Sequence, residues 1–357
     1  MDDFTTICAA MKTPVFFLTS FFLAAGPCLA QWNYPATKTV DASDIYFGKT
    51  YPDPYRWLEN TQDKEVEDWY KAQANFTDVL LAKIPARDTL AAEWMELDKL
   101  KAATYSSIHF ENGRVFYKKT LGGENVGKIY YREGWDGAEQ LLFDPTTYKP
   151  GGKTVVQSFL PSWDGEHVVL GLSAAGAEWS ELRVLKISDR SLLPEKMYPS
   201  FGPHSWTADN QSFLYDSGNT TDIKSAEIEL NRQTRVHRLG TAIETDRDIF
   251  SSESDPELNL APKEIPSAAV EASFPEYLLG DAGTVQNELR LYYAPTTDLN
   301  GPTIHWKELS RLSDNLVRGI APQGDYVYAI THAGAPKYKV VRTKLAQPDW
   351  AHAEIVV

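Results

Sequence analysis

The sequence SWDGEHVVLGLSAAGAEWSELRVLKI occupies residues 162–187 and contains the unit on which the fold prediction rests. Asp164-Gly165 is a turn signal, and the apolar run Val168–Leu170 follows it. A small-residue segment then ends at Gly176, before a second strand-like stretch at Glu181–Ile187. Two strand patterns around a short glycine-containing turn predict an antiparallel β-hairpin.

This unit recurs along the chain. The apolar runs are Val115–Tyr117, Val168–Leu170, Phe213–Tyr215, Tyr277–Leu279 and Val327–Ala329. The turns expected before them are Asn112-Gly113, Asp164-Gly165, Asp209-Asn210, Phe274-Pro275 and Gly324-Asp325. The turns expected after them are Gly122-Gly123, Ala174–Gly176, Asp216–Gly218, Asp281–Gly283 and His332–Gly334.

A repeat of about 40 to 50 residues with several strands buries its faces by stacking on neighbouring repeats, as in β-propellers. The fold predicted is mainly β, a partial β-propeller of about five four-stranded blades. A β-sandwich is the alternative, but it needs no such long period. Before the repeats, residues 65–84 have apolar positions at helical spacing, and a second helix is expected near residues 87–100. The propeller is therefore preceded by a short helical amino-terminal segment.

The amino terminus has the pattern of a secretory leader. Lys12 precedes a short apolar run and small residues up to Ala30, which predicts a signal peptide over residues 1–30 with its true start at Met11. A membrane anchor is the alternative, but the run is short for one. We expect an exported chain, periplasmic or secreted, without a stable membrane anchor. Its domains are then residues 31–103, the helical segment, and residues 104–357, an incomplete propeller.

Composition excludes several functions. The net charge is −14 with scattered acids and no basic patch, which argues against nucleic acid as a partner. Both cysteines, Cys8 and Cys28, lie in the leader, so disulfides and thiol catalysis are not expected. The seven histidines are never closer than 20 residues, and we predict no metal site and no cofactor. The acidic stretch 244–257 is interpreted as a solvated edge strand and loop.

The segment Gly171–Gly176 resembles a serine nucleophile elbow, G-x-S-x-G, only superficially. Its second glycine comes one residue late, and a strand pattern follows where an elbow needs a helix. Ser173 is therefore interpreted as part of a hairpin, and no catalytic residue is predicted in the chain.

The sequence DPYRWLE at residues 53–59, followed by Trp69 and Gln73–Asn75, resembles the amino-terminal signature of the prolyl oligopeptidase family. Residues 162–187 resemble a blade segment of the same family, and the similarity extends over residues 33–357. The resemblance implies a serine-type endopeptidase that cuts short peptides after proline, in which a seven-bladed propeller caps an α/β-hydrolase domain. In that family the catalytic Ser, Asp and His follow the propeller, so none is carried over. The chain is expected to be an inactive fragment lacking two blades and the catalytic domain.

The resemblance also implies one substrate contact. A propeller phenylalanine that lines the family's substrate cavity stands five residues before a Trp-Thr pair, as Phe201 stands before Trp206-Thr207. Core packing explains Phe201 equally well. The expected role is to gate short proline-containing peptides, with a separate catalytic chain as a candidate partner. The alternative is a non-catalytic propeller that binds other molecules. Four apolar residues of the helical segment are expected on an exposed patch unless the segment folds back on the propeller: Trp57, Trp69, Phe76 and Leu80.

Overall fold

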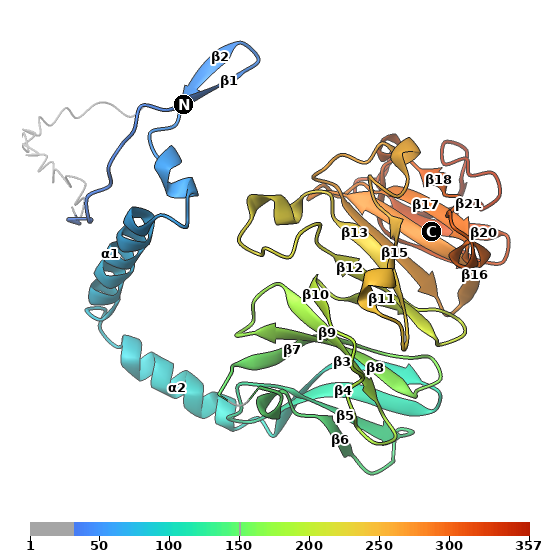
Figure 1. Cartoon of the computed structure of the whole chain (residues 1–357), viewed down its shortest axis with the longest axis horizontal. Coiled ribbons are helices and arrows are strands. Elements are labelled where there is room, and N and C mark those ends of the chain that lie inside the picture. Colours follow the sequence, from blue (N-terminus) through green and yellow to red (C-terminus); the bar gives the residue numbers. More distant parts are fainter. Residues whose placement is uncertain (1–31, 150) are drawn as a thin grey trace, which may run out of the picture. The chain divides into compact units, whose positions relative to one another are not determined.

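The computed structural model describes residues 32–149 and 151–357 (Figure 1). The predicted leader lies outside these residues. The chain forms two compact units, and the boundary between them lies between Glu93 and Trp94, inside helix α2 (Arg87–Lys99). The first four-stranded sheet begins later, at Ala103. Over the described part of the chain, no helix has both the length and the apolar character to cross a membrane.

The first unit contains a hairpin and a long helix. The hairpin pairs β1 (Ser43–Tyr46) with β2 (Lys49–Pro52), and the sequence analysis did not predict it. Helix α1 (Lys64–Leu81) begins after Asp63, whose carboxylate accepts a hydrogen bond from the Glu65 backbone N–H at 2.8 Å. Every residue of α2 is exposed to solvent.

The four apolar residues expected on an exposed patch are half-buried instead: Trp57, Trp69, Phe76 and Leu80. The Trp69 indole N–H donates to the Thr37 hydroxyl at 2.9 Å. The rings of Tyr34 and Phe76 lie 5.2 Å apart. The expectation of an exposed patch was wrong because residues 34–38 contact Trp57, Trp69 and Phe76.

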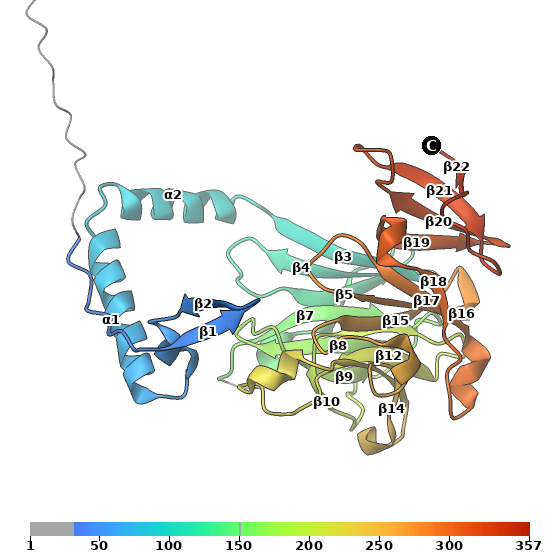
Figure 2. The same cartoon turned by 90° about the horizontal axis from the view of Figure 1, so that it is seen from above.

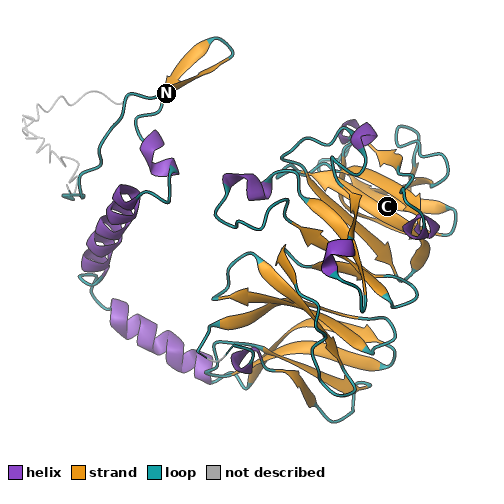
Figure 3. Ribbon diagram, in the orientation of Figure 1, coloured by secondary structure: helices purple, strands orange, loops and turns teal. Residues whose placement is uncertain are grey.

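The second unit consists of five four-stranded sheets in which consecutive strands pair antiparallel (Figures 1 and 3). Blade 1 comprises β3 (Ala103–Glu111), β4 (Arg114–Leu121), β5 (Lys128–Glu133) and β6 (Gln140–Phe143). Blade 2 comprises β7 (Thr154–Pro161), β8 (His167–Ala174), β9 (Ser180–Lys186) and β10 (Met197–Ser200). Blade 3 comprises β11 (Pro203–Trp206), β12 (Ser212–Ser217), β13 (Gln233–Arg238) and β14 (Arg247–Phe250).

Blade 4 comprises β15 (Ile265–Glu271), β16 (Phe274–Gly283), β17 (Arg290–Pro295) and β18 (Lys307–Ser310). Blade 5 comprises β19 (Leu316–Gln323), β20 (Tyr326–Thr331), β21 (Lys339–Lys344) and β22 (Glu354–Ile355), drawn in red in Figure 2. The five apolar runs found in the sequence all lie in the second strand of a blade.

Neighbouring blades pack face to face through separate apolar clusters. Phe116 of blade 1 and Leu170 of blade 2 belong to one cluster. Val169 of blade 2 and Phe213 of blade 3 belong to the next. Two further clusters join blade 3 to blade 4 and blade 4 to blade 5. Sheets stacked in series in this way confirm the predicted partial β-propeller and exclude a two-sheet sandwich.

Three predicted turns were wrong. Asp216 and Ser217 still belong to β12, and Asp281–Gly283 belongs to β16. The turn expected at Phe274-Pro275 lies two residues earlier, at residues 272–273. Small and polar residues suggested turns at Asp216–Gly218 and Asp281–Gly283, but pairing with neighbouring strands extends β12 and β16 into these positions.

Antiparallel pairing gives each sheet two distinct ends. The turns between first and second strands lie at one end, named here the turn end. The hairpins between second and third strands and the links between blades lie at the other, the link end.

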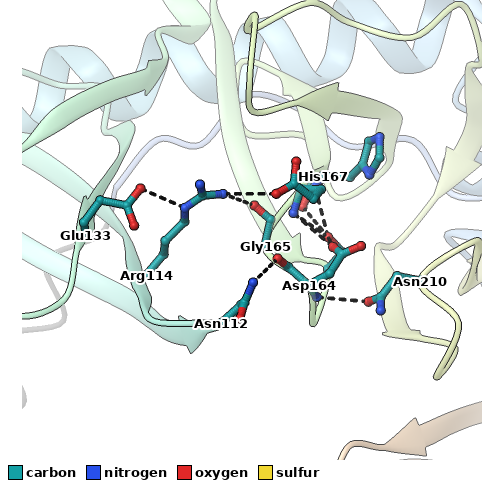
Figure 4. A network of polar contacts seen from close by, with 9 residues as sticks. Asn112, Arg114, Glu133, Asp164, Gly165, His167 and Asn210 are labelled. Atoms are coloured by element: carbon teal, nitrogen blue, oxygen red, sulfur yellow. Dashed lines mark hydrogen bonds and ion pairs between the residues drawn. The ribbon is translucent and has the colours of Figure 1, made fainter.

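Polar contacts join the turns of blades 1, 2 and 3 at the turn end (Figure 4). The Asn112 side-chain amide donates to the carbonyl oxygen of Asp164 at 2.7 Å. The Asp164 backbone N–H donates to the Asn210 side-chain oxygen at 3.2 Å. Arg114 adds a bond from Nη1 to the Gly165 carbonyl oxygen at 2.6 Å. Three consecutive blades are thus linked turn to turn.

The acidic stretch 244–257 is not solvated throughout. Asp246 is 6% exposed, and its Oδ1 lies 2.7 Å from Nδ1 of His237. Its Oδ2 accepts a hydrogen bond from the Tyr215 hydroxyl at 2.8 Å. The prediction of a solvated stretch was wrong for Asp246 because two buried strands of blade 3 supply partners for its carboxylate.

Candidate functional site

Phe201 lies at the link end, in the short link between β10 of blade 2 and β11 of blade 3. Its side chain is half-buried, unlike the nearby Trp206, which is completely buried. Phe201 therefore retains ring surface that solvent or a ligand can reach. The topology places it beside the hairpins that follow the second strands of blades 2 and 3.

Two side chains from those hairpins contact the Phe201 ring. The ring centroids of Trp179 and Phe201 lie 4.1 Å apart at an interplanar angle of 47°. The Arg232 guanidinium lies 3.8 Å from the Phe201 ring centroid, well within the range of a cation–π interaction. Phe201 therefore contacts both an aromatic ring and a cation.

Arg232 is itself fixed by a buried ion pair with Asp216 at the end of β12. The Arg232 and Asp216 side chains are 7% and 4% exposed. Burial raises the pKa of Asp216 to about 6, although the Arg232 charge opposes this shift. The pair holds the guanidinium in position over Phe201.

His204 of β11 completes the cluster. Burial, together with the nearby positive charge of Arg232, lowers the pKa of His204 to about 4. The imidazole is therefore neutral at neutral pH. Its Nε2 atom is buried without a hydrogen-bond partner among the described residues. We name the group Trp179, Phe201, His204, Asp216 and Arg232 the link-end cluster.

The sequence pointed to only one residue of this cluster, Phe201, as a candidate substrate contact. Trp179 lies within the segment 162–187 that resembles a family blade, but nothing in the sequence gives it a role, and His204 is one of seven widely spaced histidines. The sequence predicts Asp216 as a turn residue, and no pattern marks Arg232 as part of a site. Phe201 and Arg232 stand far apart in the sequence, so only the order of blades 2 and 3 brings them together.

The other residues weighed in the sequence have ordinary structural positions. Ser173 lies in β8 and is 1% exposed, and the hairpin to strand β9 follows it. His332 lies in the hairpin after β20, where Nε2 is 2.8 Å from a carboxylate oxygen of Glu288. Within residues 32–149 and 151–357, no three His, Cys, Asp or Glu side chains gather in a way that suits a metal ion.

Comparison with known proteins gives consistent similarities. A family model described as the N-terminal β-propeller domain of prolyl oligopeptidase matches residues 34–357. A prolyl endopeptidase of Elizabethkingia meningoseptica is 27% identical over 88% of this chain and 43% of its own length. Prolyl oligopeptidase A of Amanita bisporigera is 22% identical over 91% of this chain and 46% of its own. The chain thus spans less than half the length of these relatives.

Solved structures agree. A structure from a study of two prolyl endopeptidases is 25% identical, with a TM-score of 0.73 over 91% of this chain and 46% of its own. Prolyl oligopeptidase B of Galerina marginata, bound to a 25mer macrocyclization substrate, gives a TM-score of 0.71 at 23% identity. At that identity the second likeness concerns the fold alone.

Proposed function

This chain belongs to the prolyl oligopeptidase family through its N-terminal β-propeller domain, and we propose that it is the part of a serine-type endopeptidase that gates short proline-containing peptides. The observation that carries the proposal is the link-end cluster. It offers a partly accessible aromatic ring, fixed by Trp179 and Arg232, at the end of the sheets where the blade links lie.

An aromatic surface of this kind suits proline. Proline-containing segments dock on aromatic side chains, and their restricted backbone loses little entropy on binding. Phe201 would contact the peptide, while Arg232 and Trp179 would orient its ring.

The catalytic groups would come from outside these 357 residues. Acyl transfer by a serine needs a nucleophile, a base, an orienting acid and oxyanion donors that act together. Exposed apolar side chains in the amino-terminal part support a docking role for that region: Tyr70, Val79, Leu81, Ile84, Leu90, Trp94, Met95 and Leu97. We propose that they receive the catalytic part, and that the protein acts after export from the cytoplasm.

A non-catalytic binding propeller is the alternative function. It would use the same half-exposed Phe201 but would need no catalytic partner. Reading the gene beyond codon 357 separates the two. Two further repeats and a G-x-S-x-G motif in a strand-turn-helix context would support the peptidase, and a stop codon with no such frame nearby would support the binding module.

Calorimetric titration tests the peptide site. The purified chain is titrated with a short peptide that has an internal proline and with the same peptide carrying alanine instead. We expect weak binding of the proline peptide and about tenfold weaker binding after Phe201→Ala. Phe110→Ala is the matched control, because Phe110 is 53% exposed in β3 of blade 1 and stacks on Trp135, outside the cluster.

Equal binding of both peptides would contradict the proposal. So would equal losses for Phe201→Ala and Phe110→Ala, since the effect would then not belong to the link-end cluster.

A further inference from the structure

A cavity at the link end lies between blades 1 and 2 and has a volume of about 380 Å³. Strand β4 of blade 1 forms one wall, and strands β7 and β8 of blade 2 border the opposite side. The lining residues with hydrogen-bonding side chains are Lys118, Thr120, Asn125, Gln157 and Ser173. The cavity contains no member of the link-end cluster, and nothing in the proposed function uses it.

The cavity has an unusual charge for this chain. No aspartate or glutamate lines it, although the chain carries 49 acidic residues against 35 basic ones. Lys118 makes no ion pair with any described residue, and its ammonium has one long contact, 3.5 Å to the Val156 carbonyl oxygen. Lysines close by are neutralised: Lys119 lies 2.6 Å from Glu139, and Lys128 lies 3.0 Å from Glu124. The cavity thus presents a positive charge without a protein counter-ion.

The positions of Lys118 and Thr120 are constrained by packing. They stand two residues apart in β4 and therefore share one face of the strand. Gly127 of the following hairpin lies against both, since a Cβ atom there would come within 2.8 Å of Lys118 Cγ and of Thr120 Oγ1. A glycine at this position leaves room for the two side chains to lie side by side.

Neutral polar groups border the cavity together with this cation. Asn125 and Gln157 bring side-chain amides, and Thr120 brings a hydroxyl. Ser173 is 1% exposed, and its hydroxyl has no hydrogen-bond partner among the described residues. A lysine ammonium surrounded by neutral donors suits a carboxylate, because a charged acceptor forms stronger hydrogen bonds than a neutral one.

We propose that this cavity binds a carboxylate group through Lys118, with Thr120 as a second contact. The carboxylate belongs either to the carboxy terminus of a peptide or to an acidic side chain. The carboxylate site is separate from the proposed proline contact at Phe201, so an experiment can refute either proposal and leave the other standing.

Calorimetric titration of the purified chain with small probes tests the site. N-acetylglycine offers an α-carboxylate, N-acetylaspartate α-amide offers a side-chain carboxylate, and N-acetylglycinamide offers none. We expect one or both acids to bind with a dissociation constant on the order of 1 mM and the neutral amide not to bind. The acid that binds more tightly identifies the source of the carboxylate.

Variants assign the binding to the cavity. Lys118→Met should weaken binding of the acid at least about tenfold, and Thr120→Val should weaken it several-fold. Lys186→Met is the matched control, because Lys186 is exposed at the end of β9 and does not line the cavity, and it should bind as the wild type does. Far-ultraviolet circular dichroism and thermal melting check that each variant is folded.

Four results would overturn the proposal. The first three are binding of the neutral amide as tight as that of the acids, wild-type binding by folded Lys118→Met, and no binding of either acid by the wild type. Equal weakening by Lys118→Met and Lys186→Met would also overturn it, because it would indicate attraction by the overall charge.

Discussion

At the scale of single residues, burial shifts the pKa values of two members of the link-end cluster, His204 and Asp216, in opposite directions. Burial disfavours the charged form of both, so the pKa of His204 falls to about 4 and that of Asp216 rises to about 6. Asp216 keeps Arg232 in place, and Arg232 in turn holds Phe201. The charge state of buried residues therefore bears on the position of the proposed peptide contact.

His204 should make the fold sensitive to acid. Its pKa in the folded chain lies below the ordinary value of 6.5, so between pH 6.5 and 4 the unfolded chain binds a proton that the folded chain does not. Its contribution to stability is therefore lost as pH falls through this range, by up to about 3 kcal/mol. Asp216 has the opposite effect on stability. Its pKa in the folded chain is raised to about 6, so as pH falls below 6 the folded chain binds its proton before the unfolded chain does, which favours the folded state.

His204→Asn removes only the first of these effects. We expect the variant to gain free energy of unfolding relative to the wild type as pH falls from 7 to 4.5, measured by urea denaturation. Parallel pH profiles of the two proteins would show that His204 is not held neutral by burial.

At the scale of structural elements, the second strand of every blade was predicted correctly because its apolar run is repeated in the sequence. The ends of these strands were predicted less well. Asp281 pairs with Ser267 of β15 on one side and with Leu291 of β17 on the other, and that pairing outweighs the turn propensity of Asp281–Gly283. The β1–β2 hairpin was not predicted because its turn places Phe47, a bulky residue, at a φ of +53° before Gly48, which is not a usual turn sequence.

The turn of blade 1 offers a test of the contacts that join blades. Asn112 has a φ of +45°, which glycine adopts without strain, and its side chain bonds to blade 2. Asn112→Gly should lose the bond alone, about 1 kcal/mol. Asn112→Ala should lose the bond and add backbone strain, about 2 kcal/mol or more in total. Equal stabilities of both variants and the wild type in urea denaturation would show that the turn contacts do not stabilise the stacked blades.

Helix α2 should be the first element to be cut by a protease. None of its residues is buried, so local opening costs little tertiary packing. Limited digestion with trypsin should cleave first between residues 82 and 100, where Lys83, Arg87 and Lys99 are exposed. Mass spectrometry of the first fragments gives the answer. Initial cleavage inside the blades, with this segment protected, would show that α2 is covered by other parts of the protein in solution.

At the scale of the whole molecule, the sequence predicted the architecture more fully than the site. The number and the length of the five repeats predict stacked four-stranded sheets, because each repeat must cover its apolar faces against a neighbour. Phe201 was identified only through the family resemblance. Its neighbours were not, because contacts among Trp179, Phe201 and Arg232 depend on how two successive blades face each other and leave no local pattern.

We propose that this chain recognises peptides without cleaving them. The sequence holds no G-x-S-x-G elbow, and Ser173, the nearest approximation, is buried in a strand. The triad and the oxyanion donors act as a unit, so a chain without them should retain no measurable peptidase activity.

Incubation of the purified chain with a chromogenic Gly-Pro substrate, with and without a serine-directed fluorophosphonate, measures this directly. We predict no release of chromophore above a buffer blank and no covalent labelling. Turnover that disappears on labelling would contradict the claim, and labelling located at Ser173 would identify that residue as a nucleophile.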